Sequence, residues 1–462
     1  MQDERKPGLP GPANEAGLTP ALRVFRRLVD VEPGEVSSLA WSCLYFFALL
    51  ASAFVLRPLR DSLGLNGGAD QYPWLFTGTL VVMLLVSAPF AWLVTKLPRK
   101  RFIPIVYRTS IVCLLAFWAA FEFLPKSTTL AASYTFFIWF SVFNLFVVSV
   151  FRGFMADIWN FAQAQRLFGF IGLGGTLGGL TGSWLATQLA RPIGSTRLIF
   201  LSVVLLELAV FAVRRLVAIH RIDEAPAAQP EDSREAAPSD VWRGLRLIVS
   251  TPYLRWIASY IFLYGLIGTF LYFQQGKLVE ATMPGRDERT AYFAAIEFWV
   301  QLGTIGVQLF LTARLLRWFG TTFALVSQPA VALVGVMVLA MAMYQSADWA
   351  AQGVTIAGLV PELAVLALVQ IVLRISNFAT AQPAREALYT VVEREVKYKS
   401  KSFIDTFVYR LGDSLGAWAF LGILKLQVAL AGIALLTVPL AGLWIFVGRA
   451  LGIRQRRLTS SD

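Results

Sequence analysis

Residues Ser37–Leu56, SSLAWSCLYFFALLASAFVL, contain no charged side chain and run directly into Arg57-Pro58-Leu59-Arg60-Asp61. A helix of about 20 residues is ~30 Å long, which matches the hydrocarbon core of a bilayer. The stretch is therefore expected to span a membrane, with the charged segment at the end of the span. Ionisable groups at membrane depth are costly and are usually retained for moving a solute, so this pairing favours a transporter.

The composition of the whole chain agrees with a membrane protein. Hydrophobic residues make up 56% of the chain and charged residues 15%, which lies outside the usual range of soluble domains. The sequence predicts an all-α polytopic membrane protein with 12 transmembrane helices, and the apolar signal is weakest in 167–189 and 402–424. The expected spans are 37–56, 72–95, 103–123, 130–151, 167–189, 196–213, 253–273, 291–313, 321–343, 353–376, 402–424 and 427–448.

The basic residues are distributed unevenly along the chain. If both termini are cytoplasmic, most of the 41 lysines and arginines fall in cytoplasmic segments, as the positive-inside rule requires. Topology then explains the formal net charge of +12, and no nucleic-acid partner is expected. We expect a multi-pass protein of a bacterial plasma (inner) membrane, in contact with the lipid bilayer and monomeric.

Cysteine and histidine are too few to support a metal site or a disulfide framework. Cys43 and Cys113 fall inside expected spans, and the lone histidine, His220, lies outside them. The chain also has no Walker A sequence, and its spans leave no room for a soluble catalytic domain. The sequence therefore predicts a transporter rather than an enzyme, with no metal and no cofactor.

The spans form two sets of six around a charged, Ala/Pro/Glu-rich connector. Gly174–Gly178 in one half and Gly412–Gly416 in the other have similar sequences at an offset of 238, which indicates an internal repeat. Two six-helix halves around a central cavity are typical of a major facilitator-like fold. The Gly-x-x-x-Gly spacings within 167–189 predict close helix packing. The expected organisation is a cytoplasmic tail 1–36, an N-terminal half 37–213, a cytoplasmic linker 214–250, a C-terminal half 251–449 and a cytoplasmic tail 450–462.

Charged residues at membrane depth are the candidate substrate-binding residues. They are Arg57, Arg60, Asp61, Arg410 and Asp413. Arg57 and Arg60 also suit anchors at the membrane interface. Arg410 and Asp413 are three residues apart and share a helix face, so they either satisfy each other or line the translocation path.

A second group of polar residues in the spans is interpreted as candidates for coupling or gating. They are Asp405, Glu297, Arg374, Asn144 and Glu207. Glu207 equally suits a partner charge that holds two helices together, and Arg108 suits a topology anchor beside a cytoplasmic basic loop. The run of alternating charges from Arg385 to Lys401 is expected to be a loop with a solvated face, and gating salt bridges on the cytoplasmic side are the alternative.

Short motifs along most of the chain resemble one transporter family. Leu56–Asp61 resembles the Leu-Arg-Asp-x-Lys-Asp segment of nucleotide (ATP/ADP) exchange transporters. The similarity continues at Phe151–Asp157, Arg166–Gly169, Lys399–Asp405 and Arg410–Gly412. The resemblance implies a twelve-helix carrier that exchanges nucleoside triphosphate for diphosphate without hydrolysis.

The functional charges of that family are only partly present. Arg60 stands where the family has a lysine, and Asp61 matches the aspartate that follows it. Asp413 stands at the position of a second lysine, and two family glutamates fall near Phe140 and Tyr272. The resemblance therefore indicates a divergent bacterial branch of the family.

The functional prediction is an alternating-access carrier that exchanges nucleotides, ATP for ADP. The alternative is a proton- or ion-coupled major-facilitator-type permease for another small solute, including an anionic one, with Asp413, Asp405 or Glu297 as the titrating carboxylate. A third hypothesis is a membrane scaffold that transports nothing and tolerates loss of all its intramembrane charges.

Overall fold

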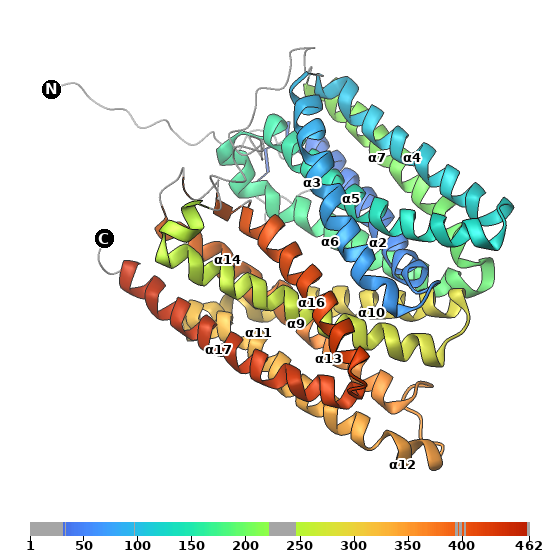
Figure 1. The fold of residues 1–462 in the computed structure, drawn as a ribbon. Helices are drawn as coiled ribbons and strands as arrows, with labels where there is room; N and C mark the ends of the chain where they lie inside the picture. The colour runs from blue at the N-terminus through green and yellow to red at the C-terminus, as the bar shows by residue number, and fades with distance from the viewer. Residues whose placement is uncertain are drawn as a thin grey trace.

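In the computed structural model, the described residues are 31–459 without positions 33, 97, 221–245, 393–395, 397–399 and 402. Most of the predicted tail 1–36 and of the predicted linker 214–250 lies outside them, as does the end of the tail 450–462. The described part folds into helices joined by turns (Figure 1). Before the linker these are α2 (Val36–Gly64), α3 (Tyr72–Lys96), α4 (Arg99–Phe123), α5 (Lys126–Ile158), α6 (Phe161–Ile193) and α7 (Leu198–His220).

The second part of the chain repeats long helices but interrupts some of them. Short π-helical segments, η5 (Asn377–Ala381) and η7 (Ile404–Val408), lie next to α13 and α16. The α-helices after the linker are α9 (Pro252–Thr282), α10 (Arg286–Val307), α11 (Ala313–Tyr344), α12 (Ser346–Ala351), α13 (Pro361–Ser376), α14 (Gln382–Leu388), α16 (Tyr409–Lys425) and α17 (Leu430–Thr459).

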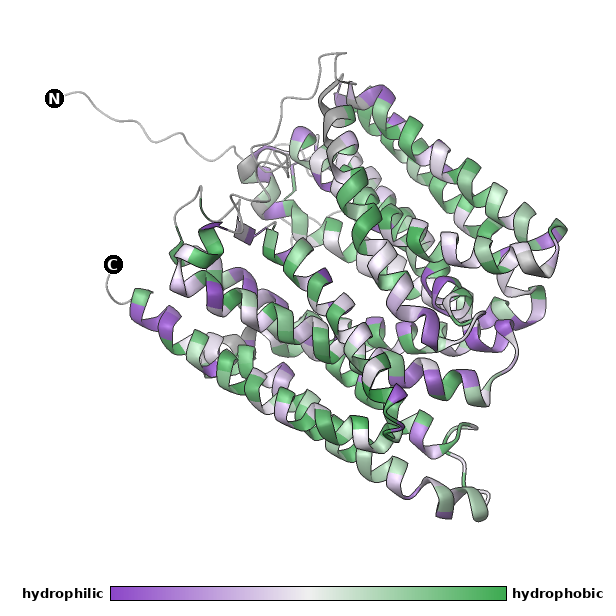
Figure 2. Ribbon diagram, viewed as in Figure 1, coloured by the Kyte–Doolittle hydropathy of each residue, from purple (hydrophilic) through white to green (hydrophobic). Residues whose placement is uncertain are grey.

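Ten helical segments within the described residues are long and apolar enough to cross a membrane. Figure 2 shows hydrophobic residues along most of the helix lengths and many hydrophilic residues at the helix ends. Helices α6 and α16 are not among the ten, in keeping with the weak apolar signal of 167–189 and 402–424. The all-α membrane architecture is confirmed, whereas the count of twelve spans stays a prediction.

Glycines let α6 pack closely against a neighbouring helix. Gly174, Gly178 and Gly182 follow at intervals of four and lie against the backbone of α2, where an added Cβ at Gly174 would stand 2.6 Å from the carbonyl oxygen of Cys43. Gly412 and Gly416 of α16 lie in the same way against the backbone of α9. The repeat seen in the sequence therefore has one structural role in both halves, which is close packing of two helix backbones.

Gly178→Ala is expected to lower the free energy of unfolding by about 1–3 kcal/mol, because overpacking strains a well-packed site. The new Cβ would overlap the carbonyl oxygen of Phe47, which belongs to the α2 backbone and cannot rotate away. Gly172→Ala in the same helix is the matched control, because a Cβ there meets nothing within 4 Å. Thermal unfolding of the two variants in detergent measures the difference, and equal stability would contradict the close-packing role.

The apolar cores divide the molecule into two halves. One core contains buried residues from Val31 to Leu216 alone, and another contains residues from Ile248 to Leu451 alone. Two further cores contain residues of both halves, and one of these packs Tyr72 and Phe137 against Phe273. Figure 1 shows the first half in blue to green and the second in yellow to red. Each half therefore has its own interior, and the shared cores join them.

The shared contacts concentrate at the end of the molecule where α2 ends and α10 begins, which we call the closed end. There the Asp287 carboxylate accepts hydrogen bonds from the backbone N–H and the hydroxyl of Ser195, at 2.8 and 2.5 Å. Lys277 Nζ lies 3.0 Å from the carboxylate of Asp70. The opposite end, where α2 begins and α17 ends, is called the terminal end.

The tenth expected span differs from the prediction at both of its ends. The helix begins at Pro361 rather than near residue 353, because Gly353 and Gly358 adopt positive φ and Pro361 starts the helix at its first position. Helical structure then continues through η5 into α14, which contains Arg385. The expectation that Arg385 lies in a solvated loop is therefore wrong.

Candidate functional site

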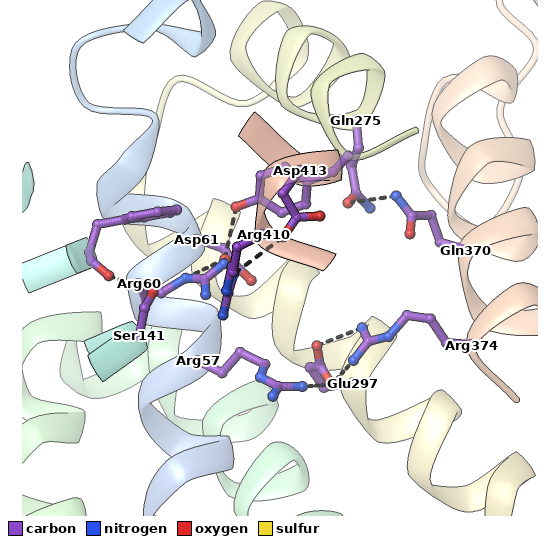
Figure 3. Close-up of polar contacts among 12 residues, drawn as sticks. Arg57, Arg60, Asp61, Ser141, Gln275, Glu297, Gln370, Arg374, Arg410 and Asp413 are labelled. Carbon is purple, nitrogen blue, oxygen red and sulfur yellow. Dashed lines mark hydrogen bonds and ion pairs between the residues drawn. The ribbon is translucent and has the colours of Figure 1, made fainter. Parts of the chain in front are cut away.

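A carboxylate shared by two arginines lies between the halves. Glu297 of α10 accepts two hydrogen bonds from the Arg374 guanidinium of α13, at 2.6 and 2.7 Å. Arg57 of α2 approaches the same carboxylate at 3.5 Å (Figure 3). The paired geometry of Arg374 is the strong bidentate form, and Arg57 makes the group a link from the first half to the second. We call these three residues the Glu297 bridge.

A second ion pair lies one helical turn further along α2. Arg60 contacts the neighbouring Asp61 carboxylate at 2.6 Å, and the same carboxylate accepts a hydrogen bond from the Tyr272 hydroxyl of α9 at 2.9 Å. The guanidinium of Arg60 lies 4.4 Å from the ring centroid of Phe137. An aromatic face and a carboxylate together fix the guanidinium plane, so Arg60 is held in one orientation.

The third pair lies on α16. Arg410 Nη1 is 3.3 Å from Asp413 Oδ2, and the Thr269 hydroxyl of α9 donates to the other carboxylate oxygen at 3.2 Å. The prediction that Arg410 and Asp413 share a helix face agrees with this geometry. Next to them, Ser414 and Thr77 are hydrogen-bonded at 3.0 Å, which joins α16 to α3 of the first half.

The arginines, rather than the carboxylates, are the accessible members of these three pairs. Arg57, Arg60, Arg374 and Arg410 have side chains 19–27% exposed, whereas Asp61, Glu297 and Asp413 are 5–9% exposed. Four arginines face three carboxylates, so one positive charge is in excess. Such a group leaves its guanidinium donors partly accessible and keeps its acids buried. Its chemistry suits the binding of an anion with several oxygen atoms.

Amides and tyrosines beside the ion pairs were mostly missed by sequence reasoning. Gln370 donates to Gln275 at 3.4 Å (Figure 3). Gln275 in turn donates to the Tyr292 hydroxyl at 3.2 Å. Gln275 could be found because it follows an apolar span. Tyr272 was marked only as the place near which a family glutamate falls. Gln370 could not be found, since a single polar residue within an apolar helix carries no pattern.

Three of the coupling candidates lie away from this group. Glu207 of α7 pairs with Arg108 of α4 at 3.3 Å, and both side chains are nearly half exposed, so the pair holds two neighbouring helices together. Asn144 of α5 is partly buried and forms no hydrogen bond with another described residue. Asp405 lies in η7 and lines a separate cavity of about 270 Å³ in the second half.

Comparison with known proteins places the chain in a family. Residues 124–454 match the model of the TLC ATP/ADP transporter family, which is more than half of the sequence. The chain belongs to the TLC ATP/ADP transporter family. ADP,ATP carrier protein 1 of Chlamydia pneumoniae is 24% identical to this family member, over 92% of this chain and 91% of that protein. The chloroplastic ADP,ATP carrier protein 2 of Arabidopsis thaliana is 23% identical, over 87% of this chain and 71% of that protein.

Solved structures show that this family member has a major-facilitator-like fold. An auto-inhibited POT family peptide transporter aligns with a TM-score of 0.61 and 13% identity, over 90% of this chain and 97% of that one. The nucleoside transporter NupG aligns with a TM-score of 0.59 and 13% identity, over 89% and 99%. At these identities the similarity shows the fold alone. The matched relatives are carriers and not enzymes. The family member is therefore a transporter, as the sequence predicts.

Proposed function

We propose that the protein exchanges ATP for ADP across a membrane by alternating access, without hydrolysis. The observation that supports this most directly is the accessible set of four arginines between the halves, backed by buried carboxylates. A nucleotide brings several negative charges, and arginine matches phosphate oxygens with bidentate hydrogen bonds. Membership in the TLC ATP/ADP transporter family supports the same substrate class.

In the proposed cycle, the substrate phosphates compete with Glu297 for its two arginines. A phosphate group bound by Arg57 and Arg374 takes the place of the carboxylate, and the link between α2 and α10 weakens. Contacts at the closed end then separate, and the second conformation opens on that side. An empty carrier keeps the bridge intact, so the return step requires a second nucleotide, which is the basis of exchange.

The proposal includes the finer topology. Twelve spans in an N-terminal half 37–213 and a C-terminal half 251–449 are supported by the two separate cores and by the paired glycine packing. The linker 214–250 and the tails 1–36 and 450–462 are placed in the cytoplasm, because that orientation satisfies the positive-inside rule. In this orientation the terminal end faces the cytoplasm. We take the membrane to be a bacterial inner membrane.

A proton- or ion-coupled permease is the second candidate. The environment of Asp413 favours it. The Asp413 side chain is 6% exposed, and Arg410, at 3.3 Å, is its one ion-pair partner among the described residues. A buried carboxylate with a single long ion pair suits a group that gains and loses a proton during a cycle.

Uptake of labelled ATP into proteoliposomes distinguishes the two functions. Vesicles preloaded with ADP are expected to take up ATP, whereas empty vesicles are not, because the proposed carrier returns only when loaded. A protonophore is expected to leave this uptake unchanged. Absence of ATP uptake by folded protein, or uptake that collapses with the protonophore and needs no internal ADP, would overturn the exchange function.

A further inference from the structure

The second half contains a cavity that is lined by none of the residues of the three ion pairs. It has a volume of about 270 Å³ and lies near the terminal end, between the first turns of α9, the segment from η5 to α14, and η7. Three tyrosines, two amides and three charged side chains account for its polar lining. They are Tyr264, Tyr389, Tyr409, Asn377, Gln382, Arg385, Glu386 and Asp405.

The cavity adjoins the set of four partly accessible arginines through one shared tyrosine. Tyr409 lines the cavity, and its ring centroid lies 5.6 Å from the guanidinium carbon of Arg410. The volume is slightly below the ~300–1,000 Å³ of pockets that enclose a whole ligand. The cavity therefore suits one end of a larger molecule whose other end reaches the neighbouring arginines.

The charges of the cavity make it unsuitable for phosphate. Arg385 is already engaged, because it donates to the Asn377 side-chain oxygen at 3.0 Å and lies 5.0 Å from the Tyr264 ring centroid. Asp405 forms no ion pair within 4 Å to any described residue and is exposed to the cavity. The Asp405 carboxylate would repel a triphosphate. The phosphates of a bound nucleotide must therefore lie at the four arginines between the halves.

The remaining groups offer ring faces and unused hydrogen-bonding capacity. The rings of Tyr264 and Tyr409 lie with centroids 5.5 Å apart at an angle of 32°. Tyr389 also lines the cavity, from a side chain that is 2% exposed. The Asp405 carboxylate accepts no hydrogen bond from another described residue, so its acceptor capacity is unused.

We infer that this cavity binds the nucleobase of the nucleotide, with Asp405 accepting a hydrogen bond from an exocyclic amine of the base. The inference rests on the proposed exchange function and adds to it the orientation of the substrate and its base preference. Tyrosine rings stack on any base, whereas an ionised carboxylate accepts hydrogen bonds only. The site thus favours adenine, with an amine at its ring edge, over hypoxanthine, which has a carbonyl oxygen at the same position.

Competition binding to the purified full-length protein tests the inference with two matched ligands. Labelled ATP is displaced by unlabelled ATP, by inosine triphosphate, which carries hypoxanthine, and by inorganic tripolyphosphate. The wild type is expected to prefer ATP over inosine triphosphate by about tenfold or more, the discrimination usual for one well-placed base contact. Asp405→Asn is expected to bring this ratio close to one, because an amide can donate or accept.

Two further variants separate base recognition from folding and from phosphate binding. Tyr264→Leu is expected to weaken ATP binding about tenfold through lost stacking. It should leave tripolyphosphate binding unchanged, because the guanidinium over its ring belongs to Arg385 and not to one of the four arginines. Asp348→Asn, on the exposed short helix α12, is the control and should keep the wild-type ratio.

Each contrary outcome has a distinct meaning. An unchanged ratio in Asp405→Asn, or loss of tripolyphosphate binding together with ATP binding in Tyr264→Leu, would overturn the nucleobase site while exchange stands. A wild type that binds neither nucleotide would overturn the exchange function and this site together.

Discussion

Glu297→Gln is expected to reduce ATP-for-ADP exchange by about a hundredfold or more. The substitution keeps the size of the side chain and removes the negative charge that Arg57 and Arg374 share. Breaking a buried pair by removing one partner costs about 3–5 kcal/mol, because the other charge is left uncompensated. The bridge also loses the group that a phosphate displaces, so the variant no longer responds to substrate. Initial rates in ADP-loaded proteoliposomes, together with thermal unfolding in detergent, measure both effects.

The control for this variant is Glu207→Gln. It is the same chemical change in a glutamate that also pairs with an arginine, but the pair with Arg108 is nearly half exposed and lies away from the site. Exposed ion pairs contribute only ~0–1 kcal/mol, so exchange and stability should stay near the wild type. If both variants lose transport equally, or if Glu297→Gln transports normally, the Glu297 bridge has no role in exchange.

Arg60→Ala is the second change with a large expected effect. Without the guanidinium, the 9% exposed carboxylate of Asp61 keeps a single partner among the described residues, the hydroxyl of Tyr272. The contact of Arg60 with the Phe137 ring is also lost. We expect exchange to fall about a hundredfold through the uncompensated buried charge and the lost phosphate ligand. Arg60→Lys should recover part of the rate, because an ammonium keeps the charge but not the planar, bidentate shape.

Arg191→Ala is the matched control for Arg60→Ala. Arg191 pairs with Glu288 at 3.8 Å, and both side chains are largely exposed, so its removal should leave uptake and folding nearly unchanged. Membrane extraction and gel filtration confirm that each variant is folded before its rate is compared. Retained exchange in folded Arg60→Ala would reduce Arg60 to an anchor at the membrane interface.

Local patterns in the sequence predicted local features of the structure. The three-residue spacing of Arg410 and Asp413 places them on one helix face, and the structure pairs them. The glycine spacing in 167–189 predicted close helix packing, and the backbone of α2 lies against these glycines. The family followed from motifs that occur in order along the chain, which need no knowledge of contacts.

Contacts between distant segments could not be read from the sequence. Glu297 stands 240 residues from Arg57 and 77 from Arg374, and the sequence offers no rule that selects these partners among several ionisable residues. Glu207 and Arg108 were considered separately for the same reason. The cavity around Asp405 was missed because it depends on helical structure continuing past Asn377 into α14.

The contacts at the closed end have a thermodynamic consequence. Many of them join a side chain to a main-chain group, such as the Ser62 hydroxyl to the carbonyl oxygen of Arg286 and the backbone N–H of Ala69 to Glu280. Water can replace either partner when the halves separate, so each bond contributes only ~0.5–1.5 kcal/mol net. In these terms the two halves resemble two subunits joined in one chain, and the hydrogen bonds at the closed end are the part of their interface that separates most easily. The covalent connection supplies the effective concentration that lets these bonds form again.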